Sequence, residues 1–223
     1  MTKLPFLVLF TFFSVIPAEI IQSQNKIPFG KISYGDLENA PYKPDPGADA
    51  IILSDEGIAS LNYNGNEFYV ELVRDVKIRI VNSNGYDYAN IQLPFSSGDD
   101  IMKYTASTFN MRDGEIVETP IAKKNFIIDR TSKNLKILKF NFPDVHEGSV
   151  LEYSYTANLK DYAVNIMVPW KFQSDIPVVK SILTIAYPEY FKYKSIISGS
   201  AMSVFTNPSS RNSTFFTIGR AHV

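Results

Sequence analysis

One short segment of this sequence combines the residue types that metal or acid–base chemistry needs. His146 stands in the run 143–148, between Asp144 and Glu147, so imidazole and carboxylate groups occur together. Adjacent residues on one tight turn rarely aim at a single ion, and no second histidine of the expected domain completes a ligand set. We therefore predict a solvated turn here, without a metal ion.

Asp99 and Asp100 form a second candidate, a pair of neighbouring carboxylates. General acid–base catalysis needs two carboxylates that face one substrate and differ in pKa. Neighbours that follow Ser-Ser-Gly are more typical of a solvated loop. Asn82, Asn84 and Asp87 distantly resemble a calcium-binding loop but lack its terminal glutamate, so a turn is favoured there as well.

The parts needed for nucleophilic catalysis are missing. The chain has no cysteine, which excludes disulfides, thiol nucleophiles and cysteine-ligated metal centres. Serine is abundant, but a triad needs a histidine base, and His146 is the one available in the expected domain. Neither a G-x-S-x-G elbow nor a phosphate-binding glycine loop occurs. We therefore predict no catalytic residue and no cofactor, and expect that the chain is not an enzyme.

Tyr162 and Trp170 are the candidate binding residues. An exposed tryptophan near a tyrosine could form a platform for a glycan or a peptide. A single tryptophan is more often a plug in the core of a β-sandwich, which would place Phe172 beside it on one side of a strand. Burial of Trp170 is favoured, and the platform remains the alternative.

Composition is typical of a folded domain without a nucleic-acid partner. Apolar residues make up 45% of the 223 residues, enough for a sizeable core. Basic and acidic residues number 22 and 23, so the charge balance predicts no affinity for nucleic acid.

The N-terminus is typical of an export signal. Lys3 precedes an apolar run over residues 4–16, which is short for a membrane span, and polar residues follow. We expect a signal peptide over residues 1–23, cleaved before Gln24; an uncleaved anchor or a buried strand is the alternative. No later segment is apolar enough to span a membrane.

The elements that must position these side chains are predicted to be strands. Residues 68–81 alternate between two faces except at Arg74, where we expect a bulge or a polar pair. Asn-Ser-Asn-Gly at 82–85 and Asp-Gly at 113–114 predict hairpin turns. Further strands are expected over residues 50–53, 86–95, 105–111, 115–118, 135–142, 149–157, 179–187 and 191–197.

Two spaced motifs carry a resemblance to a known family. Residues 142–155 (FPDVHEGSVLEYSY) and 170–178 (WKFQSDIPV) resemble the P-x-V-x-x-G-S-x-x-E-Y-x-Y and W-x-F-Q-x-D-I-P stretches of a domain of unknown function. That domain stands N-terminal to transglutaminase-like domains in exported proteins of gram-negative bacteria. Residues 188–193 and the turn at 84–85 also fit, and the resemblance covers about residues 48–200.

The resemblance implies an antiparallel β-sandwich upstream of a papain-like catalytic domain. The catalytic cysteine, histidine and aspartate of such a domain would lie C-terminal to this region. No catalytic residue can be carried over to a position here, because the chain has no cysteine.

We therefore expect an all-β chain: a signal peptide (1–23), a Pro/Gly-rich linker or arm (24–47) and an antiparallel β-sandwich (48–217). Residues 218–223 can be reverse-translated into common sequencing-adapter DNA, so we expect a non-native read-through tail.

Three functions follow as hypotheses. The leading one is a non-catalytic accessory domain, periplasmic or at the cell surface, whose partner is a downstream transglutaminase-like domain of the same natural chain. The second is a stand-alone glycan- or peptide-binding module that uses Tyr162 and Trp170. A hydrolase is the weakest, because no base–nucleophile pair is present.

Overall fold

The computed structural model describes residues 27–38, 42–162, 168–188, 191, 204–206, 209–210 and 213–221, the last three ranges by their backbone. The expected signal peptide and nearly all of the strand expected over residues 191–197 lie outside these residues. None of the described helices is long and apolar enough to cross a membrane.

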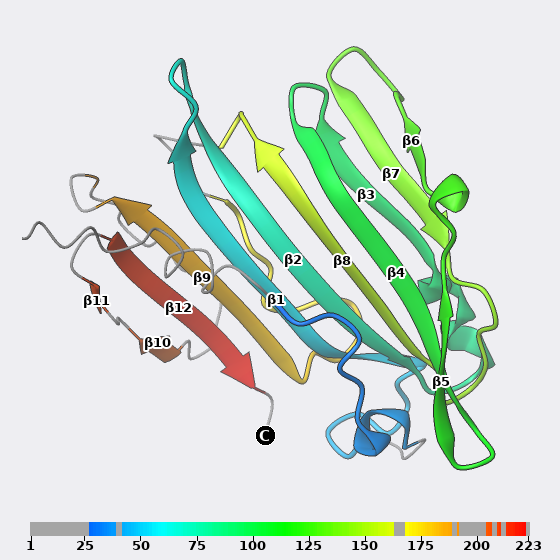
Figure 1. Cartoon of the computed structure of the whole chain (residues 1–223). Helices are drawn as coiled ribbons and strands as arrows, with labels where there is room; N and C mark the ends of the chain where they lie inside the picture. The colour runs from blue at the N-terminus through cyan, green and yellow to red at the C-terminus, as the bar shows by residue number, and fades with distance from the viewer. Residues whose placement is uncertain are drawn as a thin grey trace, which may run out of the picture.

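The described strands form two sheets (Figure 1). The large one has nine strands in the order β10–β12–β9–β1–β2–β8–β4–β5, with β11 on β12. Its strands are β1 (Ala50–Tyr63), β2 (Phe68–Ile80), β4 (Asp100–Arg112), β5 (Glu115–Pro120), β8 (Val150–Leu159), β9 (Lys180–Pro188), β10 (Val204–Thr206), β11 (Ser209–Ser210) and β12 (Ser213–Ala221).

The small sheet has three antiparallel strands in the order β3–β7–β6. These are β3 (Asn90–Ser96), β6 (Ile127–Asp129) and β7 (Leu135–Asn141), and short 3-10 helices cover η1 (Tyr34–Leu37), η2 (Ser83–Ala89) and η3 (Lys123–Asn125). The all-β prediction is confirmed.

The core lies between the small sheet and one face of the large sheet, called the inner face here. Strand β2 sends its even-numbered apolar residues to this face, as its alternation predicts. Phe95 of β3 meets Tyr155 of β8 with ring centroids 5.5 Å apart, and Phe140 of β7 meets Tyr153 at 5.8 Å. These edge-on aromatic pairs join the two sheets in one hydrophobic cluster.

The opposite, outer face of the large sheet carries the N-terminal arm, which is residues 27–38. Within the arm, Ser33 caps η1 through a capping box with Asp36. Leu37 is buried with Phe109 and Val150 of the sheet. Part of the segment expected as a linker or arm therefore packs against the domain.

The break expected at Arg74 is a polar pair. The β1–β2 and β2–β8 ladders run through this residue without interruption, and Arg74 pairs with Asp55 across the strands. The register shift of the β1–β2 pair lies instead in β1, between Ile52 and Ser54. A half-buried arginine on an apolar face can keep the ladder intact when a carboxylate of the neighbouring strand pairs with it.

Two expectations about strand order were wrong. Residues 82–85 do not close a hairpin, because η2 leads the chain from β2 into the other sheet, where β3 pairs with β7. The large sheet is not purely antiparallel, because β1 and β9 run parallel. The long connection from β8 to β9 allows this, whereas a tight turn would enforce antiparallel pairing.

The hairpin predicted at Asp113-Gly114 is confirmed: Arg112 pairs with Glu115, and both turn residues have positive φ, 51° and 83°. At the other end of the chain, residues 218–221 of the expected read-through tail belong to β12, whose backbone pairs with β9.

Candidate functional site

The turn between β7 and β8 brings together the polar residues in which the sequence suggested metal chemistry. Asp144 has a φ of 58° and Gly148 a φ of 86°, so the turn needs two left-handed residues. Aspartate and glycine are residue types that adopt this conformation readily. The sequence Pro-Asp-Val-His-Glu-Gly thus specifies a compact turn beside the β4–β5 hairpin.

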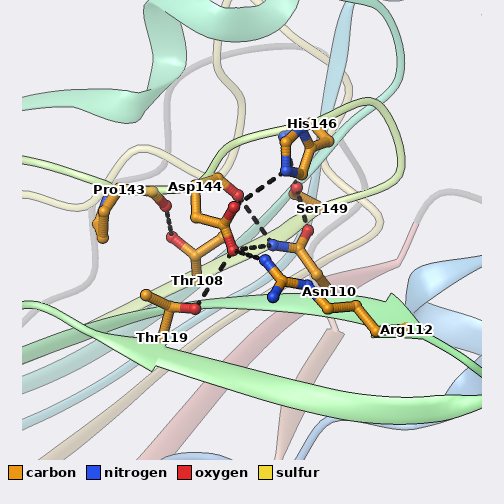
Figure 2. Close-up of polar contacts among 8 residues, drawn as sticks. All are labelled: Thr108, Asn110, Arg112, Thr119, Pro143, Asp144, His146 and Ser149. Carbon is orange, nitrogen blue, oxygen red and sulfur yellow. Dashed lines mark hydrogen bonds and ion pairs between the residues drawn. The ribbon is translucent and has the colours of Figure 1, made fainter.

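Asp144 is the centre of a polar network that ties this turn to the hairpin (Figure 2). Its Oδ2 accepts from Arg112 Nη2 at 2.6 Å, from Asn110 Nδ2 at 3.2 Å and from Thr119 Oγ1 at 3.4 Å. Its Oδ1 lies 3.0 Å from His146 Nε2. The carboxylate therefore joins strands β4 and β5 to the turn.

The electrostatics of the network favour a charged Asp144. The hydrogen bond with His146 has the largest effect and lowers the pKa of Asp144. Burial opposes this shift, and the charge of Arg112 lowers the pKa further. Glu147 is exposed and does not join the network. Among the described residues, no group of three potential ligands could hold a metal ion.

Ser149 lies near the Asp144–His146 pair, as a nucleophile would in a serine triad. Its side chain is buried, with 1% of its surface exposed. The Oγ donates to Asn110 Oδ1 and accepts from the backbone N–H of His146 at 2.8 Å. A hydroxyl held in this way by buried partners supports the turn and is not placed to attack a substrate.

Asp99 and Asp100 do not face a common substrate. Asp99 is 2% exposed and accepts from the backbone N–H groups of Ser96 and Lys160 at 2.9 and 3.0 Å, while burial raises its pKa. Asp100 is exposed, 3.3 Å from Lys160 Nζ. Asp99 precedes β4 and its carboxylate is turned into the fold, whereas Asp100 is the exposed first residue of β4, which separates the two carboxylates.

The residues proposed as a calcium-like loop form a helix cap. Asn82 Oδ1 accepts from the N–H of Asn84 at 2.9 Å, and its amide donates to Asp49 Oδ1 at 2.9 Å. Asn82 thereby caps η2, and both polar atoms of its side chain form hydrogen bonds within the fold. Asp87, the third residue of that set, lies exposed in η2.

The two predicted binding residues, Tyr162 and Trp170, line the same cavity of about 360 Å³ at the inner face. The remaining wall is mostly apolar, with an arginine and two carboxylates: Leu72, Arg74, Pro94, Phe95, Ser96, Asp99, Leu135, Tyr155, Leu159, Asp161, Val168 and Pro169. The structure thus places both residues at one concave surface.

Trp170 is half-buried and packs against the core together with Phe172. Neither lies in a strand, so the predicted strand around them was wrong. The indole Nε1 donates to Ser181 Oγ at 2.9 Å, and the Arg74 guanidinium carbon lies 4.6 Å from the ring centroid. Gly57 lies against the ring, where a side chain would not fit.

Arg74 is itself held in place. Its Nε and Nη2 donate to the two carboxylate oxygens of Asp55 at 2.8 and 2.7 Å, a bidentate pair, and Asp55 is 4% exposed. Arg74, Asp55 and Ser181 therefore position Trp170 as a wall of the cavity. Tyr162 has no hydrogen bond that ties its ring in this way among those found for the described residues, and it is the more adaptable of the two.

A pair of buried carboxylates on the outer face was not predicted from the sequence. Asp75 is 1% exposed and Glu152 fully buried. Burial and then the charge of Glu152 raise the pKa of Asp75 to about 8, and burial also raises that of Glu152. In the alternating strand pattern both residues belong to the polar face. They differ from solvent-exposed acidic residues only because other parts of the chain cover that face.

A model of a domain of unknown function with solved structure, DUF3857, matches residues 69–214. This range covers well over half of the chain. The chain belongs to the DUF3857 family. The resemblance to a domain of unknown function is thereby confirmed, while an adjacent transglutaminase-like domain remains a prediction. A comparison with curated proteins gives no match.

Three solved structures are similar to this DUF3857 chain at low identity. The crystal structure of a protein from Parabacteroides distasonis, described as a candidate protease, is 13% identical, with a TM-score of 0.60 over 78% of this chain and 36% of that one. Bestatin-bound yeast LTA4 hydrolase is 11% identical (TM-score 0.38; 92% and 32%). An M1 zinc metallopeptidase from Deinococcus radiodurans is 8% identical (TM-score 0.36; 77% and 39%).

Only the first of these similarities is close enough to compare folds, and it says nothing about activity. The DUF3857 chain spans about a third of the length of that protein. Residues 142–155 form the turn and the first, buried part of β8, and among the described residues no nucleophile and base are arranged there.

Proposed function

We propose that this DUF3857 chain is a non-catalytic accessory domain of an exported protein, N-terminal to a transglutaminase-like domain that it positions or shields. The observation that carries the proposal is the fold shared with a longer candidate protease, because the alignment covers only 36% of that protein. The apolar run over residues 4–16 supports export to the periplasm or the cell surface of a gram-negative bacterium.

The side chains of the turn over residues 143–149 support a non-catalytic role. Acyl transfer by a papain-like route needs a thiolate, a histidine that activates it and a third group that orients the histidine. This chain has no cysteine. His146 and Asp144 form an oriented pair, but the nearby Ser149 hydroxyl is buried and engaged with Asn110.

The test compares the 223-residue chain with the natural protein extended beyond it. Both are treated with a fluorophosphonate and with iodoacetamide, and are assayed on peptide and glutamine-donor substrates. The short chain is expected to show neither labelling nor turnover, and the longer protein to be labelled at a cysteine of the added region.

Stoichiometric fluorophosphonate labelling of the short chain, lost in His146→Ala, would overturn the proposal. His146→Gln is the matched control, because glutamine keeps a hydrogen-bond donor for Asp144 but cannot act as a base. A longer protein with no reactive cysteine would also contradict the proposed partner domain.

A second candidate function is a glycan- or peptide-binding module, and the cavity shared by Tyr162 and Trp170 favours it. The hydrogen bond from Trp170 to Ser181 and the contact with Arg74 fix the indole ring in the wall of the cavity. Tyr162 is therefore the residue expected to contact a ligand. Aromatic side chains serve both ligand classes, because a ring stacks on sugars and packs on peptide side chains alike.

NMR titration of the full chain with an oligosaccharide set and an unstructured-peptide set tests this second function. Binding is expected to shift the Trp170 indole resonance and to weaken in Tyr162→Ala, but not in Tyr86→Ala, which removes an exposed ring elsewhere. No shift with either set, or equal loss in both variants, would exclude the cavity as the binding site.

A further inference from the structure

The N-terminal arm is held on the outer face by two kinds of contact. Leu37 and Ile32 supply an apolar contact with Phe109 and Val150. In Figure 1 the arm, drawn in blue, crosses the large sheet near the ends of its central strands. Leu37, Phe109 and Val150 are buried in this contact, and the polar contacts add to it.

The polar contacts join side chains of the sheet to backbone atoms of the arm. Glu152 Oε2 accepts from the N–H of Gly30 at 2.8 Å, and Lys77 Nζ donates to the carbonyl oxygen of Lys31 at 2.8 Å. Arg79 Nη1 donates to the carbonyl oxygen of Glu38 at 2.8 Å. The bonds from Lys77 and Arg79 pair a charged group with a peptide group, which makes them stronger than neutral hydrogen bonds. Glu152 can accept from Gly30 whether its carboxyl group is protonated or ionised.

The carboxylate that holds Gly30 lies in a poor environment for a charge. Glu152 is fully buried, with Lys77 Nζ at 3.6 Å, and Asp75 lies one row further along the same face. Neither Asp75 Oδ2 nor Glu152 Oε1 has a hydrogen-bond partner among the described residues. Two buried carboxylates thus face one lysine.

The other charges around the pair come from every neighbouring strand and from the arm. Glu56 of β1, opposite Asp75, is engaged with Lys180 of β9 at 2.7 Å, and Glu118 of β5 accepts from the Ser107 hydroxyl of β4 at 2.6 Å. Asp55 of β1 also raises the pKa of Asp75 through its charge. Other charged residues on the adjoining elements are Arg79 of β2, Lys103 of β4, and Lys31, Asp36 and Glu38 of the arm.

These neighbours leave the pair short of positive charge. Burial and the charge of Glu152 raise the pKa of Asp75 to about 8, and burial raises the pKa of Glu152. With the arm docked the pair therefore holds protons that hydrated carboxylates would release. As the pH rises towards the raised pKa values, the docked state loses stability relative to an open state in which water reaches Glu152.

We propose that residues 27–38 are a strap that closes over Glu152 and Asp75 while these are protonated and lifts off the outer face when they ionise. Opening uncovers a strip of the outer face along β2, β8 and β4 that contains Phe109 and Val150. The strap controls access to this strip in response to pH, independently of the proposed accessory role.

Distances between spin labels on the full chain test the strap. The chain has no cysteine, so Tyr34→Cys on the arm and Met111→Cys on β4 give two unique labels at exposed positions. A single short distance is expected near pH 6, and a longer second distance at higher pH. The open-to-closed ratio should rise about tenfold per pH unit for each proton released.

Two variants connect the opening to the buried pair. Glu152→Gln keeps an oxygen that can accept from Gly30 but cannot ionise, so the short distance should persist up to about pH 9. Asp75→Asn should flatten the pH dependence in part, and Glu115→Gln, an exposed acid of β5, should leave it as in the wild type.

The same distance distribution in the wild type at low and high pH would overturn the strap. Equal opening of the wild type and of both Glu152→Gln and Asp75→Asn would overturn the role of the pair. If Glu152→Gln does not fold, Asp75→Asn alone decides, because a pH dependence unchanged from the wild type contradicts the proposal.

Discussion

The contact between Gly57 and Trp170 allows a sharp test of how the cavity wall is held. A Cβ atom at Gly57 would lie 2.5 Å from two carbons of the Trp170 ring and 3.2 Å from Leu183 Cδ1. Carbon atoms do not approach to 2.5 Å, so Gly57→Ala must push the ring out of its place. Gly57 lies between β2 and β9, where it pairs with Arg74 and Leu183, so its backbone is held by the sheet and the ring is the part that moves.

The cost of moving the ring follows from its contacts. Its hydrogen bond to Ser181 is worth about 0.5–1.5 kcal/mol, and the Arg74 contact about 0.5–2 kcal/mol. Partial exposure of a large apolar ring adds about 1.5–3 kcal/mol. We therefore expect Gly57→Ala to lower the free energy of unfolding by about 3–5 kcal/mol.

Urea denaturation of a double-mutant cycle is the assay. In Trp170→Ala the ring is gone, so adding Gly57→Ala should cost almost nothing, or stabilise the strand by about 0.5–1 kcal/mol. The expected coupling free energy is therefore at least about 3 kcal/mol, the upper range for residues in contact. Gly98→Ala is the matched control, because no atom lies within 4 Å of its added methyl group.

Additive effects in the double variant would refute the reasoning. They would mean that the methyl group at Gly57 is accommodated without displacing Trp170, and that the ring is not fixed against this strand. A loss in Gly98→Ala as large as in Gly57→Ala would show a general effect of replacing glycine.

Three further predictions concern the carboxylates and the hairpin. Asp75→Asn should stabilise the protein by up to about 4 kcal/mol at pH 7. The raised pKa of Asp75 in the wild type makes the free energy of folding less favourable as the pH rises from about 4 to 8. Thermal melts should show that the stabilisation in the variant vanishes below about pH 4. Asp144→Asn should lower the melting temperature less than Asp144→Ala. The pKa of Asp144 is lower in the folded than in the unfolded chain, so its ionised form stabilises the fold above the unfolded pKa, and this stabilisation is lost as the pH falls through the folded pKa. The difference in melting temperature between the wild type and Asp144→Asn should therefore shrink in acid. Gly114→Ala, at φ 83°, should cost about 1 kcal/mol in urea denaturation, and no change would contradict the assigned turn.

The strands and one hairpin could be predicted because their signals are local. Alternation over residues 68–81 predicts both faces of β2, and Asp113-Gly114 predicts the turn between β4 and β5. Strand pairing is not local. The turn at residues 82–85 has hairpin chemistry, yet η2 directs the chain to the second sheet, because β8 takes the place beside β2 that β3 would have filled.

The candidate site shows the same limit. The sequence placed His146 beside Asp144 on a turn, and this is where they lie. The attachment of that turn to Arg112 depends on residues more than 30 positions apart. Such long-range contacts leave no periodic signal in the sequence, so the hydrogen bonds by which Asp144 attaches the turn to the hairpin could not be inferred in advance.

Composition and alternation were sufficient to establish a β-rich chain without a thiol. Two sequence motifs indicated its family. Burial of the polar face was decided by tertiary structure alone. Glu152 has the pattern of a surface residue, and it loses contact with water because the arm over residues 27–38 packs against β2, β8 and β4. The ionisation of a carboxyl group depends on what covers it, and that is a property of the assembled layers, which a strand's own alternation does not encode.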